Sequence, residues 1–387
     1  MIAPETLSAE NRPVDGAFVF WQGEDRPRRQ SRFAVGAVWE LVGCLVASLS
    51  FTVLVFALAG SHPEFGVFVC WVLSFLVLYT VTTRLLHGVF TAKDRLATVC
   101  VWGGASIALF PLIQIIWSVT VRGGPVVFVH FPAFLVHDMS GAAANAPTWK
   151  GGMGNAIIGT AEQVGLATLY TVPISMLTAI YLSESSSTFS RLVRTIVNSM
   201  MGTPSIIAGL FVYFLWVQPR GTAGFSGVAA SIALAILMLP IMIRTAEEVI
   251  RVVPGALREA ALALGSPRWR VSLKVVLPTI RSGLITAVIL GVALAVGETA
   301  PILLTSRWNR QFNLNPFHGP QASLALQVFS LIRLSQNVYV RDAWGGAFIL
   351  VWMVLILFIA ARIIGSAPPG GRRIRRPRQT TKEVPVQ

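Results

Sequence analysis

The chain is organised as eight long apolar runs separated by polar connections. The runs cover about residues 36–59, 66–82, 96–119, 154–182, 199–217, 225–243, 282–304 and 344–364. Each has about the twenty residues that a helix needs to cross roughly 30 Å of hydrocarbon. The pattern predicts eight transmembrane helices. Two have insecure ends: the run at 154–182 is long and polar enough to be tilted or broken, and Gly202 and Pro204 interrupt the start of the run at 199–217.

Composition agrees with a polytopic membrane protein. Of the 387 residues, 54% are hydrophobic and 12% are charged, too few charges for a soluble core of this size. The formal charge of +14 would suggest nucleic acid in a soluble chain, but in a membrane protein such an excess more often encodes topology. No nucleic-acid partner is therefore expected.

Basic residues predict the orientation. If both termini are cytoplasmic, 24 of the 31 Lys and Arg residues fall on the cytoplasmic side, as the positive-inside rule requires. The 1–33 segment lacks the short apolar core of a removable signal peptide, so the first span must direct insertion. The basic tail is expected to be disordered near anionic lipid.

The external connections suggest surface elements. Residues 120–153 contain Phe128, Phe131 and Phe134, and residues 305–343 contain an amphipathic run, Leu324–Leu334. Both are expected to form interfacial surface or a lip for a partner. The three cysteines, Cys44, Cys70 and Cys100, lie in apolar runs without metal-binding spacing, so they are expected to be buried, and no metal site is predicted.

The most informative connection is the cytoplasmic loop 245–281. Pro254 suits a first helical turn, and Leu257, Ala261 and Leu264 would form one apolar stripe. Gly265 can end this helix in a left-handed conformation, and Ser266-Pro267 can cap and restart a second helix that Leu277-Pro278 ends. Such a hairpin could dock into another protein or lie on lipid headgroups, and the pattern alone slightly favours the headgroups.

The spacing within this loop resolves that choice. It reads Glu259-Ala260-Ala261, three residues, Gly265, nine residues, Val275, one residue, Leu277-Pro278. This resembles the EAA signature by which permeases of bacterial ABC importers engage their ATPase. The resemblance implies coupling roles for these positions: Leu257, Arg258, Glu259, Ala260, Ala261, Gly265 and Pro278.

Three further segments narrow the resemblance to the PstA-type permeases of phosphate importers. They are Pro173–Glu184 (PISMLTAIYLSE), Gly202–Phe211 (GTPSIIAGLF) and Gly297–Leu304 (GETAPILL). The resemblance implies an all-α, MetI-like type I transmembrane domain at 96–365, in the bacterial cytoplasmic membrane. Residues 34–95 would be an additional two-span hairpin, and 1–33 and 366–387 basic cytoplasmic ends.

The same resemblance implies partners and a division of labour. They are a sister permease (PstC), a PstB-type ATPase dimer, the external binding protein PstS, membrane lipid and inorganic phosphate. The sequence has no GxxxxGK[ST] glycine loop, so this chain is expected to bind no cofactor and to be no enzyme, with ATP and Mg held by the ATPase. Alternatives are a permease for another oxyanion or small solute, a phosphate-signalling scaffold, or a secondary transporter, which the EAA loop disfavours.

Within the spans, Glu298 and Arg244 are candidates for the substrate pathway, with Thr299 beside Glu298. A carboxylate inside a span costs about 2.5–3.5 kcal/mol, so Glu298 needs a partner. It could pair with a cation, donate a hydrogen bond to phosphate when protonated, or be a packing residue. Arg244 could snorkel at the membrane surface, or bind phosphate through paired N–H donors.

The resemblance also implies a second pathway arginine in some relatives at the position where this chain has Leu294, so no anion path built on that residue is expected here. Glu40 and Glu162 are gating or packing carboxylates rather than expected ligands. Three prolines are expected to interrupt helices: Pro204, Pro240 and Pro301.

Overall fold

The computed structural model describes residues 35–59, 64–142 and 150–366. The regular secondary structure in these ranges is all helical, and the basic ends predicted at 1–33 and 366–387 lie outside them except for Ser366, the last residue of α15. By contacts the chain divides into two compact units, Met1–Phe110 and Pro111–Gln387. The division falls inside the long helix α3 (Val89–Val129).

The first unit contains α1 (Val35–Ala59) and α2 (Glu64–His87), which pack together as an antiparallel hairpin, and the start of α3. Between α1 and α2, the Thr52 and Ser74 hydroxyls are 3.2 Å apart. At one end, Arg95 of α3 donates to Glu40 of α1 at 2.6 Å. Glu40 therefore fixes α1 to α3. Cys44 is buried, but Cys70 is half-buried and Cys100 is exposed, so the expectation of three buried cysteines is wrong for Cys100, on a helix face that no other element covers.

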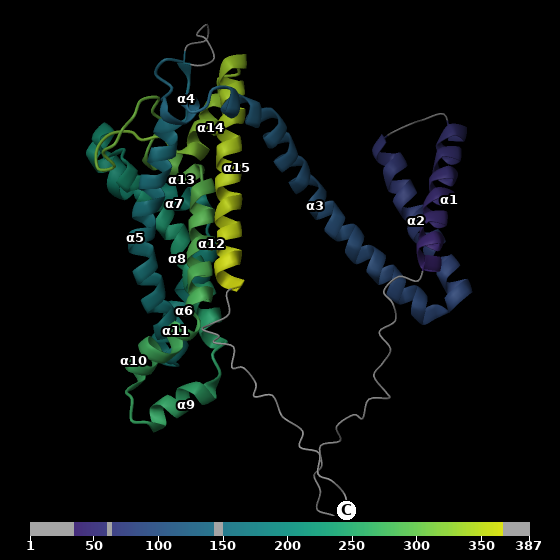
Figure 1. The fold of residues 1–387 in the computed structure, drawn as a ribbon, viewed down its shortest axis with the longest axis horizontal. Helices are drawn as coiled ribbons and strands as arrows, with labels where there is room; N and C mark the ends of the chain where they lie inside the picture. Colours follow the sequence, from purple (N-terminus) through teal and green to yellow (C-terminus); the bar gives the residue numbers. More distant parts are fainter. Residues whose placement is uncertain (1–34, 60–63, 143–149, 367–387) are drawn as a thin grey trace, which may run out of the picture. The chain divides into compact units, whose positions relative to one another are not determined.

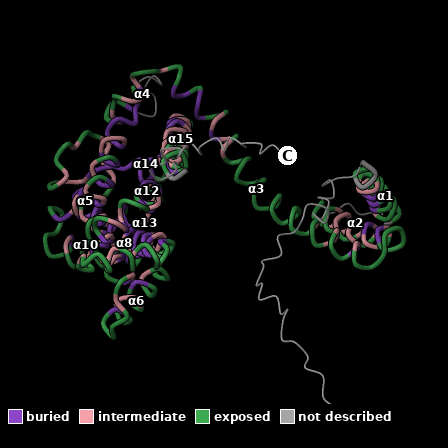
Figure 2. The backbone as a smooth tube through the Cα atoms, turned by 60° about the horizontal axis from the view of Figure 1, so that its bottom comes forward, coloured by how far each residue is buried: buried purple, intermediate pink, exposed green. Residues whose placement is uncertain are grey.

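The second unit is a bundle built around α8 (Gly227–Arg251). It also contains α5 (Gly154–Glu184), α12 (Arg281–Gly297) and α15 (Asn337–Ser366) (Figure 1). Helix α8 packs against α5 and α12, and Figure 2 shows buried backbone concentrated around these helices. Alanines at positions 229, 230, 233 and 246 are fully buried on α8, and such small residues let helices approach closely in a membrane.

The long run at 154–182 is one continuous helix, α5, that passes through Pro173. The run at 199–217 is different: α6 (Thr188–Met201) ends at Gly202, and α7 (Ser205–Val212) begins after Pro204. A π-helical turn, η2 (Tyr213–Val217), and a 3₁₀ segment, η3 (Gln218–Gly224), follow α7. The axis turns by 105° between Thr188–Met201 and Ser205–Gly224, so α6 is a separate helix that the apolar pattern failed to delimit.

Among the described residues, six helices are long and apolar enough to cross a membrane, or up to eight if each bent pair counts as one span. The upper figure equals the number of apolar runs. The expectation that Pro240 interrupts a helix is wrong, because α8 is continuous and Pro240 is buried within it. The interruption predicted at Pro301 is present: α12 stops at Gly297, four residues before Pro301, and Pro301 lies in the first turn of α13 (Ala300–Thr305), where a missing N–H costs little.

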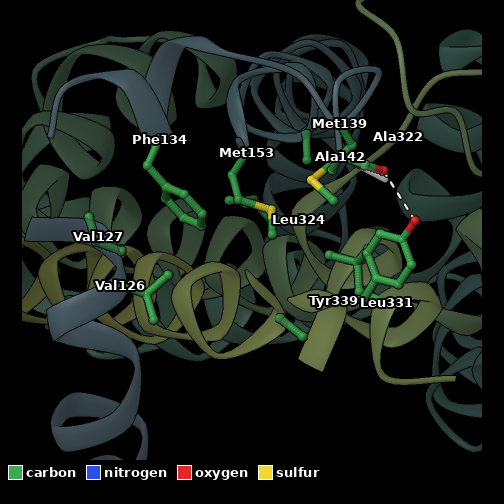
Figure 3. Packing of buried hydrophobic residues seen from close by; sticks show 12 residues of the cluster. Val126, Val127, Phe134, Met139, Ala142, Met153, Ala322, Leu324, Leu331 and Tyr339 are labelled. Atoms are coloured by element: carbon green, nitrogen blue, oxygen red, sulfur yellow. Dashed lines mark hydrogen bonds between the residues drawn. The ribbon is translucent and has the colours of Figure 1, made fainter. Parts of the chain in front are cut away.

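The two connections that were predicted to be external contribute residues to the core. Phe134 in α4 (Ala133–Val136) is 1% exposed, and α14 (Leu324–Arg333) buries Leu324, Leu326 and Leu331. Figure 3 shows Phe134 and Leu324 beside Met153, and Leu331 beside Tyr339, whose hydroxyl donates to the Ala142 carbonyl at 3.1 Å. Expecting an interfacial role was therefore wrong for Phe134 and α14, because helices from distant parts of the sequence cover them. Phe128 and Phe131 are exposed.

Candidate functional site

The loop between α8 and α12 forms a short helix, a bend and a second helical stretch. The first helix is α9 (Gly255–Ala263), and the second stretch comprises α10 (Arg268–Val271), η4 (Ser272–Val276) and α11 (Leu277–Thr279). Figure 1 shows α9 beyond the ends of the bundle helices. The predicted helix, bend and helix are therefore present, in the predicted order.

The bend depends on Gly265. Its φ is +81°, in the left-handed region that favours glycine, and its N–H donates to the Leu262 carbonyl at 2.9 Å, closing the end of α9. Cβ built at this position would meet no atom within 4 Å. The backbone conformation, rather than crowding within this chain, therefore requires glycine here.

Two details of the predicted loop are wrong. Pro267, not Ser266, is the N-cap of α10, and it has no side-chain oxygen with which to cap. Pro278 lies inside the first turn of α11, and the chain leaves helical geometry only at Ile280, where it bends by 78° into α12. The predicted stripe of Leu257, Ala261 and Leu264 is not buried in the bundle, since α9 buries no residue.

Helix α9 presents an exposed surface. Glu259 and Ala260 are exposed, and so are five large apolar side chains on α9 and the following segment: Leu257, Leu262, Leu264, Trp269 and Leu273. Leu264 is 87% exposed. Exposed apolar side chains gathered on a projecting element mark an interaction surface. The stretch 268–280 also has a buried side, since Val271, Val276 and Ile280 pack against the ends of α5 and α8 next to the loop.

Arg258 connects α9 to the two central helices. Its Nη2 donates to the Ile250 carbonyl near the end of α8 at 2.9 Å, and its Nη1 lies 3.4 Å from Glu184 Oε1 at the end of α5. The single guanidinium therefore joins three elements. Glu184 is the last residue of the PISMLTAIYLSE segment, so this segment contacts the loop directly through Arg258.

We expect Arg258→Gln to reduce substrate uptake about tenfold while leaving the amount of assembled complex unchanged, because it removes the charged tether but no buried apolar contact. The measurement is uptake by proteoliposomes, with ATP hydrolysis followed in parallel. Arg268→Gln is the matched control, since Arg268 is an exposed arginine on the same loop. Equal uptake by the two variants would contradict a special role for Arg258.

A second cluster surrounds Glu247, which the sequence interpretation did not single out. Its carboxylate is 1% exposed and contacts three arginines: Arg251 at 2.7 Å, Arg194 of α6 at 2.9 Å and Arg244 at 3.2 Å. Arg194 also donates to the Leu182 carbonyl of α5 at 3.0 Å. The cluster thus joins α5, α6 and α8. The spacing of Arg244, Glu247 and Arg251 on one helix face could have revealed two of the pairs, but no local signal points to Arg194.

Glu298 occupies the break between α12 and α13. It is half-buried in extended geometry, near the Ser205 side chain at the start of α7. Thr299, the N-cap of α13, makes no side-chain capping bond. Helices α7 and α13 approach closely here: a Cβ at Gly209 would lie only 2.6 Å from Pro301 Cα, so the contact requires glycine at this position. The GETAP and GTPSIIAGLF segments therefore pack against each other.

The structure does not bring Arg244 and Glu298 together. Helices α8 and α12 are antiparallel, with Gly283 against Val249 and Gly291 against Met242, which places Arg244 near the level of Val288. Glu298 lies ten residues beyond that level, roughly 15 Å along the bundle at 1.5 Å per residue. Any pathway that uses both residues must contact them in succession.

The other carboxylates have structural partners. Glu162 accepts a hydrogen bond from Gln321, which also contacts the buried Gln163, and Glu40 is held by Arg95. Leu294 is exposed on α12, and because its side chain is apolar, this position supplies no charge to a pathway. Among the described residues no group of three or more His, Cys, Asp or Glu side chains could hold a metal ion.

Comparison with known proteins identifies the class to which this bundle and loop belong. Residues 171–367 match the family of binding-protein-dependent transport system inner membrane components. The chain is a multi-pass membrane permease subunit of this family.

Within that class, the chain belongs to the PstA permeases. It is 35% identical to phosphate transport system permease protein PstA 1 of Mycobacterium tuberculosis over 285 residues, 73% of this chain and 90% of that protein. It is 36% identical to PstA of Mycobacterium leprae over 278 residues, 71% of this chain and 88% of that protein. Among solved structures, the inward-facing MetNI methionine ABC transporter covers 54% of this chain and 91% of its own at 20% identity, with a TM-score of 0.44.

Proposed function

We propose that this chain forms half of the pathway through which an ABC importer carries phosphate into the bacterial cytoplasm. The relatives named as phosphate permeases support the substrate, since they are 35–36% identical over about seven tenths of the chain. The other half of the pathway would come from a PstC-type permease, and PstS would deliver phosphate outside. Both termini of this chain would lie in the cytoplasm.

The exposed α9, tied by Arg258 to α5 and α8, is the observation that carries the coupling role. A PstB-type ATPase dimer, which binds ATP and Mg, would hold α9 in a groove on its surface. When the dimer closes, displacement of α9 passes to the ends of two central helices through one guanidinium and a buried apolar base. Because packed helices move as rigid bodies, this motion can open the bundle on one side and close it on the other.

Phosphate would meet two chemically different positions. Near the outer end it would pass Glu298 and Thr299 at the helix break, and near the inner end it would pass Arg244. Guanidinium groups suit phosphate because their planar N–H donors pair with two oxygens. The Glu247 carboxylate already occupies part of the Arg244 donor set, which would keep the anion from binding too tightly at its exit.

Reconstitution of the complete transporter tests this function. With PstS present, we expect inorganic phosphate to stimulate ATP hydrolysis and to enter the vesicles, whereas sulfate should do neither. Sulfate is the matched control because it has nearly the same size and geometry as phosphate. Uptake of another oxyanion in preference to phosphate would contradict phosphate as the substrate but would not affect the proposed coupling role of α9. Hydrolysis that no anion stimulates would contradict the importer proposal.

A further inference from the structure

Helix α6 presents three different faces along its 14 residues. Ser190 and Val197 are buried, with Val197 packed against Leu182 of α5 and Ile243 of α8. On the adjacent face, Phe189, Leu192 and Ile196 are large apolar side chains that are at least half exposed. The remaining exposed face is polar and is formed by Thr188, Arg191, Thr195, Asn198 and Ser199. A helix that divides its exposed surface in this way is suited to a boundary between apolar and aqueous surroundings.

The geometry places that boundary at the inner surface of the membrane. At 1.5 Å per residue α6 is roughly 21 Å long, too short to cross the hydrocarbon. It makes an angle of 105° with Ser205–Gly224, the apolar stretch that leads to the start of α8. A helix nearly perpendicular to a spanning segment runs along the membrane plane. The Arg194 bonds to Glu247 and to the Leu182 carbonyl hold it at the same end of the bundle as the coupling loop.

The exposed apolar face of α6 is continuous with an exposed apolar face of α5. The Phe189 ring lies edge-on to the Tyr181 ring of α5, with 6.1 Å between centroids, and the Tyr181 hydroxyl is 3.0 Å from Ser187 Oγ at the N-cap of α6. One turn further along α5, Leu177 is 67% exposed, and Ile174 is also exposed. Both residues belong to α5, which is long and apolar enough to cross a membrane, so Phe189 adjoins the exposed apolar surface of a candidate span.

The charges of α6 favour lipid headgroups over a protein groove. The helix contains Arg191 and Arg194 and no acidic residue. Arg191 lies in the polar face, away from the apolar side chains. A phosphate-bearing inner leaflet attracts basic groups at this depth, at about 1 kcal/mol for each Lys or Arg.

We propose that α6 is an interfacial helix that inserts Phe189, Leu192 and Ile196 into the inner leaflet and places Arg191 among the lipid phosphates. This anchor fixes the end of α8 through Arg194 and Glu247. The lipid surface thereby supports the element next to the coupling loop. The proposal is independent of the transported substrate.

Nitroxide scanning of the complete transporter in nanodiscs of phosphatidylcholine and phosphatidylglycerol tests the proposal. Cys44, Cys70 and Cys100 are first replaced by Ala, and single cysteines are introduced as Leu192→Cys, Ile196→Cys, Thr195→Cys and Asn198→Cys. Only variants that keep normal uptake are labelled. For labels at positions 192 and 196 we expect collisions with oxygen, which concentrates in hydrocarbon, to exceed collisions with a water-soluble nickel chelate severalfold. Labels at positions 195 and 198 are matched controls on the polar face and should show the reverse.

Two results would overturn the proposal. Labels at positions 192 and 196 that are immobile and shielded from both reagents would show that the sister permease covers this face. Equal collision with the nickel chelate at all four positions would show that α6 lies in water. Phe189→Cys supplies a third position on the apolar face if one of the other variants does not assemble.

Discussion

Gly265→Val is expected to abolish transport while the complex still assembles in the membrane. A β-branched residue in the left-handed region costs about 1–2 kcal/mol, and the chain can relieve that strain by changing the angle between α9 and α10. Assembly should persist because a side chain at this position meets open space. The measurements are uptake by proteoliposomes, stimulated ATP hydrolysis, and the amount of each subunit recovered after purification.

Gly265→Asn is the matched control for this prediction. Asparagine also adds a side chain, but it adopts left-handed geometry more easily than other non-glycine residues. We therefore expect the Asn variant to keep most of the uptake. Full uptake by both the Val and the Asn variant would contradict the role of the bend. Loss of uptake in both would show that the ATPase needs the open space at this position, and that backbone conformation is not the cause.

Glu247→Gln is expected to have the largest effect on stability. It removes the buried carboxylate that three arginines share, and breaking such a buried pair costs about 3–5 kcal/mol. Since the arginines are partly exposed, water will lower this cost, and we expect about 2–3 kcal/mol. The measurement is the unfolding midpoint of the purified complex, together with uptake. Glu248→Gln is the matched control, because Glu248 is exposed on the same helix and its replacement should change the midpoint little.

A second substitution distinguishes repulsion among the arginines from lost packing. If repulsion dominates, adding Arg194→Gln to Glu247→Gln should recover part of the stability, although Arg194→Gln alone should destabilise the complex. The effects of two substitutions on stability do not add when the two residues belong to one ion-pair network. If the two effects add strictly, repulsion among the arginines is not the cause of the lost stability.

Much of the architecture could be predicted from local sequence. The apolar runs locate the spanning segments because crossing a membrane requires each segment to be apolar over its own length. Gly265 could be placed at a bend for a similar reason, since left-handed geometry is a property of one residue. The prediction that Pro240 interrupts α8 failed, because neighbouring helices support a proline inside a buried helix.

The candidate site was harder to predict because its contacts join distant positions. Arg194 and Glu247 are 53 residues apart, and no spacing rule connects them. Glu184 and Arg258 lie on α5 and α9, and only the packing of α5 beside α8 brings them within 3.4 Å. The loop motif could be found in the sequence, but the contacts of Arg258 with α5 and α8 could not.

The sequence by itself therefore determined that the chain has several spans and a loop that bends at Gly265, since local hydrophobicity and backbone geometry suffice for both, while the resemblance of its motifs indicated the permease family. Only the tertiary structure decided which charges are paired, that Arg244 and Glu298 lie at different depths, and that α6 is a separate helix with two unlike exposed faces. The reason is that charge pairing, depth and exposure depend on which helices pack together. Local sequence specifies each helix, whereas the antiparallel register of α8 and α12 and the contact of α5 with α6 set their relative positions.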